Sequence, residues 1–517
     1  MPEYLHPGVY IEEIERGPKP IEGVPTSTAA FLGETERGPI QPRLVTSYKE
    51  YKRWFGGLIG PDKFLPYAVS GFFENGGKRL YVCRIVGELA TPAEAAFGNF
   101  AVRAVGAGSW GKRIWAAITD STTRKNVGGN MQPVGFCLRL AYWANPPAAF
   151  QPYDPFASAN ANKLPRPAYT ETFDDLVTEA ASPDFWEKRL LDSSALATLV
   201  RNAGPADARP PNGSQALTQN GAEDPGAIDV ADYAGDPLAA RTEPQGLAAL
   251  TLDPYRDVSL VYAPAVGADV VKKIVSHCES LRFRFAAVDC PKGVNNIGAL
   301  DPRTTLADSS YAAFYYPWIS ISDPETGARR MVPPGGHALG VYARTDTERG
   351  VFKAPANETL RGVLDLEFDI NDNGQDQLNP RGVNVVRQFP GRGIRVWGAR
   401  TMSSDALWKY VSVRRLFIFL ERSIYEGTQW VVFEPNDPRL WARVSDTIRL
   451  FLRGQWRNGA LFGRTEEQAF FITCDETVMS QDDILNGRLV CEIGIAPVRP
   501  AEFVIFRIFQ NTAEAQR

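Results

Sequence analysis

The segment between residues 257 and 288 constrains the fold of this chain most strongly, because two kinds of periodicity follow one another in it. Residues 257–262 and 285–288 are short apolar runs typical of strands. Between them, residues 268–281 repeat apolar side chains every three or four positions, which indicates a helix with one buried face. That face comprises Val270, Val271, Ile274, Val275, Cys278 and Leu281. This order forms a β-α-β unit, so the sequence predicts an α/β core.

The preceding part of the chain adds strands and a helix to this core. Residues 28–33 and 79–86 are predicted to be buried strands, and a glycine-rich turn at 75–77 precedes the second. The aromatic residues 48–55 between them predict a helix. The chain therefore begins its globular part well before the β-α-β unit.

Two amphipathic helices are predicted near the C-terminus, because apolar residues recur there at intervals of three or four. Each must pack its apolar face on another element. In the first helix the apolar residues are Val413, Leu416, Phe417, Leu420 and Ile424. In the second they are Leu440, Trp441, Val444, Ile448, Phe451, Leu452 and Trp456.

A strip of arginines lies opposite the apolar face of the second helix. At about 100° per residue its members fall within an arc of about 120°. A solvated face is one interpretation of this strip; an interface with an acidic partner surface is the other. The arginines are Arg439, Arg443, Arg449, Arg453 and Arg457.

Residues 91–250 differ from the rest of the chain in being rich in Ala, Pro, Asn and Asp. Residues 205–229 are close to a low-complexity loop. We interpret 91–250 as an inserted outer domain because of this change in composition. A length of 517 residues allows about three to five domains and so leaves room for it.

Each end of the chain carries a segment whose sequence is typical of a β-strand but that has no predicted pairing partner. Near the N-terminus, polar and apolar residues alternate around Val9, Tyr10, Ile11 and Ile14, and the segment 17–20 cannot continue a sheet. Near the C-terminus, a one-faced strand at 489–495 is broken by Pro497 and Pro500. A run with apolar residues on both faces follows, and such a terminal strand needs to be covered. Its apolar residues are Phe503, Val504, Ile505, Phe506, Ile508 and Phe509.

Charge, cysteine usage and hydropathy argue against several classes of function. Lys and Arg number 56 against 60 Asp and Glu, a net charge of −4, so nucleic acid is not expected as a partner. The six cysteines form no CxxC pair, which is typical of buried thiols in a reducing compartment and not of a disulfide framework. The N-terminal residues lack the pattern of a secretion signal. No apolar stretch approaches the ~20 residues that span a bilayer, so no membrane insertion is expected.

Catalytic motifs are incomplete in this chain. Residues 106–112 match GxxxxGK, but Arg113 stands where a P-loop needs Ser or Thr, and Trp110 lies in the loop. The same stretch spells A-G-S-W-G, a defective nucleophile elbow. A strand-to-strand turn is the favoured interpretation, and a hydrolase with a P-loop-like or subtilisin-like site is the alternative.

Histidine and carboxylate patterns point to structural roles. His6 lies in the N-terminal segment, His277 at the border of the helix face, and His337 in a loop entering a helix, where a structural hydrogen bond is favoured. Residues 369–374 match the first half of a calcium-binding loop. Pro380 stands at the twelfth position, where such a loop needs a bidentate Glu, so an Asx-rich turn is favoured. No catalytic residue, metal or cofactor is predicted.

Long motifs resemble the contractile tail sheath proteins of myophages, R-type bacteriocins and extracellular contractile injection systems. The resemblance covers roughly residues 1–90 and 251–517, and it is weak in between, around Gly108–Gly111. In the first half and the middle it is carried by HPGVYIEEI, SYKEYKRWFGG, NGGKRLYVCRIV and VFKAPANETLRGV. In the last third it is carried by LNPRGVNVVRQFPGRGIRVWGARTM, VSVRRLFIFLERSIYEGTQWVVFEPNDPRLW and VCEIGIAPVRPAEFVIFRI.

The resemblance implies a mixed α/β, multidomain chain and a structural role rather than catalysis. Its core would be subtilisin-like in fold but not in chemistry. The implied parts are an N-terminal arm (1–24), a core (25–90 with 251–380), an inserted outer domain (91–250), a C-terminal sheath domain (381–495) and a C-terminal arm (496–517).

The resemblance also implies a mechanism and a set of partners. Subunits of this family form hexameric rings that stack helically around an inner tube and contract to drive it through a target envelope. The N- and C-terminal strands would be lent to neighbouring subunits. Either the second helix with its arginine strip or the loops beside that helix would face the tube. Further implied partners are baseplate and tail-terminator or cap proteins and paralogous sheath subunits. Assembly is expected in the bacterial cytoplasm, as part of a phage tail or a released contractile particle.

Overall fold

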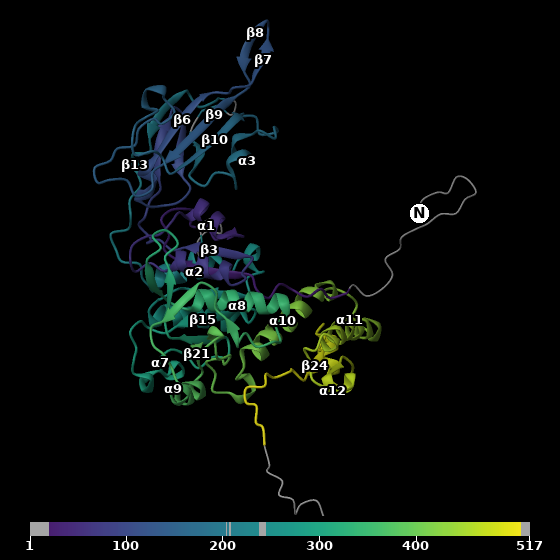
Figure 1. Cartoon of the computed structure of the whole chain (residues 1–517). Helices are drawn as coiled ribbons and strands as arrows, with labels where there is room; N and C mark the ends of the chain where they lie inside the picture. Colours follow the sequence, from purple (N-terminus) through teal and green to yellow (C-terminus); the bar gives the residue numbers. More distant parts are fainter. Residues whose placement is uncertain (1–19, 203, 206–207, 237–243, 508–517) are drawn as a thin grey trace, which may run out of the picture. The chain divides into compact units, whose positions relative to one another are not determined.

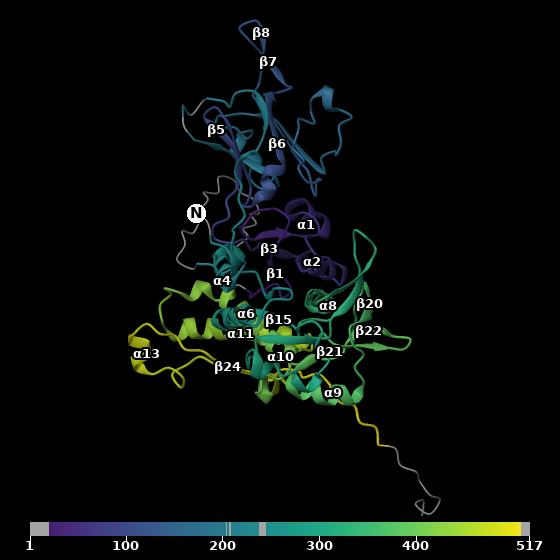
Figure 2. The same ribbon diagram turned by 90° about the vertical axis from the view of Figure 1, so that its left-hand side faces the viewer.

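The computed structural model describes residues 20–202, 204–205, 208–236 and 244–507 (Figures 1 and 2). The chain divides into two compact units. The sheet unit comprises residues 25–349 and 353–414, and the helical unit comprises residues up to 24, 350–352 and 415 onward. None of the helices in the described part of the chain combines the length and the apolarity needed to cross a membrane.

A nine-stranded sheet forms the core of the sheet unit, in the order β19-β22-β21-β16-β15-β14-β1-β3-β2. The six strands from β21 to β3 are parallel to their neighbours, and the outer pairings are antiparallel. The strands are β1 (Ala29–Gly33), β2 (Arg43–Val45), β3 (Leu80–Arg84), β14 (Leu260–Tyr262), β15 (Phe285–Asp289), β16 (Ala312–Tyr316), β19 (Glu358–Thr359), β21 (Val383–Phe389) and β22 (Gly393–Val396).

The predicted β-α-β unit is confirmed. β14 and β15 are parallel neighbours, and α6 (Ala268–Leu281) connects them. Five of the six predicted apolar residues of α6 are buried, and Leu281 is half-buried. The predicted strands at 28–33 and 79–86 are β1 and β3, which pair in parallel, and the predicted helix 48–55 is α1 (Tyr48–Phe55). The sheet also continues beyond residue 380, because β21 and β22 belong to it.

Glycines bring two helices of the sheet unit into close contact, α2 (Leu65–Glu74) and α8 (Gly335–Glu348). A Cβ atom at Gly340 would lie 2.6 Å from the Phe72 carbonyl oxygen, and one at Gly336 would lie 2.7 Å from the Ala68 Cα. Both separations are shorter than a methyl group tolerates, so only glycine fits at these positions.

Residues 93–220 form two four-stranded antiparallel sheets, in the orders β10-β9-β6-β12 and β11-β5-β4-β13. They share a hydrophobic core that includes Trp110 and Trp186. The strands are β4 (Ala93–Phe97), β5 (Phe100–Ala104), β6 (Ile114–Asp120), β9 (Phe136–Tyr142), β10 (Tyr169–Leu176), β11 (Ala197–Arg201), β12 (Gly213–Ala216) and β13 (Gln219–Asn220).

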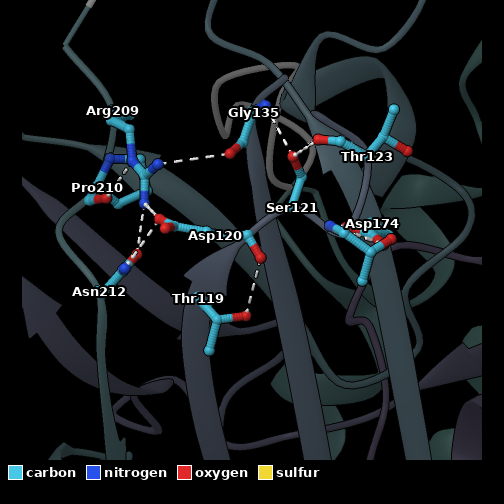
Figure 3. Close-up of polar contacts among 10 residues, drawn as sticks. Thr119, Asp120, Ser121, Thr123, Gly135, Asp174, Arg209, Pro210 and Asn212 are labelled. Carbon is cyan, nitrogen blue, oxygen red and sulfur yellow. Dashed lines mark hydrogen bonds and ion pairs between the residues drawn. The ribbon is translucent and has the colours of Figure 1, made fainter. Parts of the chain in front are cut away.

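A hairpin, β7 (Arg124–Val127) with β8 (Asn130–Pro133), projects from the end of these two sheets (Figure 1). Hydrogen bonds hold its root (Figure 3). The Ser121 hydroxyl donates to the Thr123 carbonyl oxygen at 3.0 Å and accepts from the Gly135 amide at 3.0 Å. Nearby, Asp120 accepts hydrogen bonds from Arg209 at 3.0 Å and from Asn212 at 2.9 Å. The hairpin is therefore fixed at its root rather than loosely tethered.

The helical unit is built on α11 (Pro438–Arg457) and most of α10 (Val411–Gly427). Both predicted helices are thereby confirmed. Asp437 caps α11 by accepting a hydrogen bond from the Leu440 amide at 2.8 Å, and Pro438 occupies the first turn. The remaining elements are α12 (Glu466–Ala469), β23 (Phe470–Thr473), α13 (Gln481–Leu485) and β24 (Glu492–Ile495).

Candidate assembly surfaces

The C-terminal segment presents a row of apolar side chains to solvent. Phe503, Val504, Ile505 and Phe506 are exposed by 71, 69, 78 and 83%. Residues 501–507 form no strand with any described part of the chain, so this portion of the predicted strand has no pairing among the residues that the structure describes. A contiguous exposed apolar run of this kind is typical of a surface that another molecule covers. Strand exchange stays a prediction, and its residues Val9, Tyr10, Ile11, Ile14, Ile508 and Phe509 lie outside the described residues.

β23 and β24 form a two-stranded antiparallel sheet in the helical unit. Its inner face packs on α11, while Phe471 on the other face is 54% exposed. Two strands alone are a marginal sheet in water. Residues 460–462 pair with 496–498 just past the end of β24, through an antiparallel bridge between Leu461 and Pro497. Along β23 and β24 themselves no further strand of the described residues is hydrogen-bonded, so the sheet has edges to which an added strand could pair.

The predicted arginine strip lies on α11 as expected, but its charge is partly neutralised. Arg453 donates to Glu466 at 2.6 and 3.2 Å, and Arg449 lies 3.7 Å from the same carboxylate. The Glu466 carboxylate raises the pKa of Arg453. Arg443 stacks over Trp430, with 4.7 Å between the guanidinium and the ring centre. Arg439 and Arg457 are exposed. The sequence pattern could not reveal Glu466, because that residue lies on α12.

The glycine-rich stretch at 106–112 is a turn between β5 and β6, as the favoured interpretation predicts. The Ser109 hydroxyl donates to the Glu223 carboxylate at 2.8 Å, and so does its backbone amide at 2.7 Å. Trp110 is buried in the shared core and donates its indole hydrogen to the Ala107 carbonyl oxygen at 2.9 Å. The Glu223 carboxylate thus holds both the hydroxyl and the backbone amide of Ser109, as in a side chain that fixes a turn.

Two of the three histidines lie in the described residues; His337 is buried and His277 is half-buried. His277 contacts the Arg284 guanidinium at 2.7 Å; burial and that charge lower its pKa to about 3. Burial lowers the pKa of His337 to about 4. The Nδ1 atom of His337 has no hydrogen-bond partner in the described residues, and the ring packs against Gly71. Neutral imidazoles of this kind are core side chains.

The calcium-like segment 369–374 is a helix start, in agreement with the predicted Asx-rich turn. Asn371 caps α9 (Asp372–Leu378) by accepting a hydrogen bond from the Gly374 amide at 2.9 Å. Asp372 pairs with Arg387 at 2.8 Å. Among the described residues, no group of three or more His, Cys, Asp or Glu side chains is arranged to hold a metal ion.

Two protein-family models match adjoining parts of the chain. The phage tail sheath protein central domain matches residues 226–402, and the phage tail sheath C-terminal domain matches residues 403–511. Together they cover more than half of the sequence. The predicted family resemblance is therefore confirmed over this region.

Individual relatives are tail sheath proteins of phages. That of Burkholderia phage BcepMu is 28% identical over 275 residues, which are 49% of this chain and 57% of the relative. That of Vibrio phage KVP40 is 26% identical over 266 residues, 50% of this chain and 38% of the relative. The chain thus spans about half the length of the relatives it matches.

Solved structures share the fold over nearly the whole chain. The sheath of an extracellular contractile injection system (PVC) in the contracted state covers 100% of both chains with a TM-score of 0.59 at 23% identity. The contracted helical sheath of the anti-feeding prophage covers 98% of this chain and 99% of its own, with a TM-score of 0.56 at 24% identity. A sheath tail protein of Listeria innocua gives a TM-score of 0.56 at 10% identity, covering 92 and 96%. At these identities the likeness establishes the mixed α/β, multidomain fold.

Proposed function

This chain belongs to the phage tail sheath family, and we propose that it is the structural subunit of a contractile sheath in a phage tail or contractile injection particle. The observation that carries the proposal is the match of two sheath-family models to 226–511, together with a sheath fold over the whole chain. The same family match favours a structural role over the alternative of a hydrolase.

We further propose that the subunits stack as hexameric rings around an inner tube and contract, with no substrate turned over. Two solved relatives support this proposal, since they are described as a helical sheath and as part of a baseplate of the anti-feeding prophage. We also propose that the core is subtilisin-like. The six parallel strands of the sheet unit support that proposal, which the family resemblance implies.

For the joints between subunits, we propose that the terminal arms of one subunit add strands to the β23–β24 sheet of another. β-augmentation suits a moving joint because its main-chain hydrogen bonds tolerate different side chains and survive rigid-body motion. The exposed Phe503–Phe506 run and the open two-stranded sheet are complementary halves of such a joint. A contact of this kind is heterologous, so it propagates into a helical polymer rather than closing as a dimer.

The purified full-length chain is expected to form hollow striated tubes, visible by negative-stain electron microscopy. Heterologous joints need no other component to propagate, and this is the physical reason for expecting self-assembly. The same chain with the tube protein and baseplate present as templates is the control. Monomers or small closed oligomers under both conditions would contradict the proposed function.

For the tube contact, we propose that the exposed end residues of the arginine strip face the tube. Reversing the charge of Arg439 and Arg457 to Glu is expected to weaken co-sedimentation with the inner tube protein about tenfold or more at low salt. The difference should shrink as ionic strength rises, because exposed charges are screened. Arg464→Glu, which changes an exposed arginine of the helical unit off the strip, is the matched control. Equal loss in the control variant would argue against this orientation.

A further inference from the structure

Two of the six cysteines lie next to each other on neighbouring strands of the helical unit. Cys474 follows the last residue of β23, and Cys491 precedes the first residue of β24. The strands pair antiparallel from Phe470 with Ile495 to Thr473 with Glu492. Continuing that register by one position places Cys474 directly opposite Cys491. Against a background of burial that raises the pKa of both thiols, interaction between them lowers the pKa of Cys474 and raises that of Cys491.

The register also identifies the type of pairing. The Ala496 amide donates to the Ala469 carbonyl oxygen at 2.9 Å, so Ala469 and Ala496 form a hydrogen-bonded pair. Hydrogen-bonded and non-hydrogen-bonded pairs alternate along an antiparallel ladder. Residues 474 and 491 therefore occupy a non-hydrogen-bonded pair, in which Cα atoms lie about 4.5 Å apart and the side chains are closest. That separation falls within the range that a disulfide spans.

Access to the two sulfurs differs. Cys474 is buried in the hydrophobic core of the helical unit, whereas Cys491 is half-buried. Burial raises the pKa of both thiols, that of Cys491 to about 12. The other four cysteines are all buried; Cys83, Cys137 and Cys278 lie on β3, β9 and α6, and Cys290 follows β15. None of these four stands opposite another across a strand pair, whereas Cys474 and Cys491 do.

We propose that Cys474 and Cys491 form a redox-modification site, a dithiol that a small-molecule disulfide converts into a cross-strand disulfide. The Cys491 thiolate attacks one sulfur of the reagent, forms a mixed disulfide and releases one thiolate. The Cys474 thiolate then attacks the Cys491 sulfur and releases the second thiolate. The two protein thiols lose two protons and two electrons in total, and the reagent disulfide is reduced to two thiols.

The bond would close the base of the connection 475–490, which contains α13, and it would pin the register of β23 against β24. Such a constraint acts on the sheet proposed above as the acceptor of neighbouring strands. The redox site itself does not depend on that role. It rests on the cross-strand position of the two sulfurs within a single subunit.

The test treats the folded full-length protein with oxidised glutathione and then measures its mass and its tryptic peptides. The expected product has lost two hydrogen atoms and joins the peptides 465–488 and 489–507. Its rate of formation should rise about tenfold per pH unit between pH 7 and 9, because both pKa values lie above that range. Reduction should restore the original mass.

Two variants sharpen the outcome. Cys474→Ser should stop at a glutathione adduct on Cys491, whereas the control Cys137→Ser should still form the disulfide at the wild-type rate. Thermal melts of the reduced variants establish that each is folded. A stable glutathione adduct on the wild-type protein without the joined peptides would overturn the proposal, and so would a disulfide between two chains.

Discussion

Ile505→Asp is expected to abolish sheath polymerisation and to leave the subunit folded. Ile505 is 78% exposed, so the substitution removes little packing from the isolated subunit. In the proposed joint the same position is covered by a neighbour, where an unpaired carboxylate costs several kcal/mol. A cost of about 3 kcal/mol at each joint raises the concentration needed for assembly by more than about a hundredfold. Electron microscopy and sedimentation measure the loss, and a thermal melt shows that the subunit remains folded.

Leu485→Asp is the matched control for this substitution. Leu485 is also highly exposed, at 81%, and lies in the same unit, but on α13 and outside the arm. The Leu485→Asp substitution adds the same negative charge at a position outside the proposed joint. Tubes of normal length from Ile505→Asp would contradict strand exchange by the C-terminal arm. A deletion of residues 1–23 tests the N-terminal arm in the same way.

Trp110→Ala is expected to destabilise the paired sheets of residues 93–220 by about 3–5 kcal/mol. The indole is buried in their shared core, contacts Tyr142 edge to face at 6.0 Å between ring centres, and donates a hydrogen bond to Ala107. Its removal leaves a large cavity and an unpaired carbonyl oxygen. The melting temperature should fall by roughly 10 °C, as measured by calorimetry or by circular dichroism.

The neighbouring residues separate this structural role from a catalytic one. Lys112 is exposed, so Lys112→Ala should change the unfolding free energy by less than about 0.5 kcal/mol. Lys112→Ala and Ser109→Ala should also leave assembly intact. ATPase or peptidase activity that disappears in these two variants would contradict the structural interpretation of the turn.

The sequence predicts an element best when the spacing of its own apolar residues marks the face that it buries. Helix α6 and helix α11 bury the apolar faces read from their spacing, because each packs one continuous stripe. The paired sheets of residues 93–220 could not be predicted in this way. Their strands are short and pair with distant parts of the chain, as β5 does with β11 and β6 with β12. Local patterns carry little information about such partners.

The candidate surfaces show the same limit. The positions of the strip arginines follow from helical spacing, but their pairing with Glu466 depends on how α12 packs beside α11. The C-terminal apolar run is recognisable in sequence because it lacks any polar face. Its conformation cannot be predicted from one chain, since strand hydrogen bonds require a partner. The cross-strand position of Cys474 and Cys491 likewise emerges only from the register of β23 and β24.

The strand order of the large sheet has a consequence for how the chain folds during synthesis. β1 lies between β3 and β14, so it lacks one neighbour until the ribosome has translated beyond residue 262. At about 5–20 residues per second, residues 91–250 take roughly 8–32 s to emerge. The antiparallel sheets of that segment use only residues 93–220, so they can be complete while the parallel sheet still has an open edge. The nascent subunit therefore carries finished antiparallel sheets beside an unfinished parallel sheet, and β14 is the strand whose arrival ends that exposure.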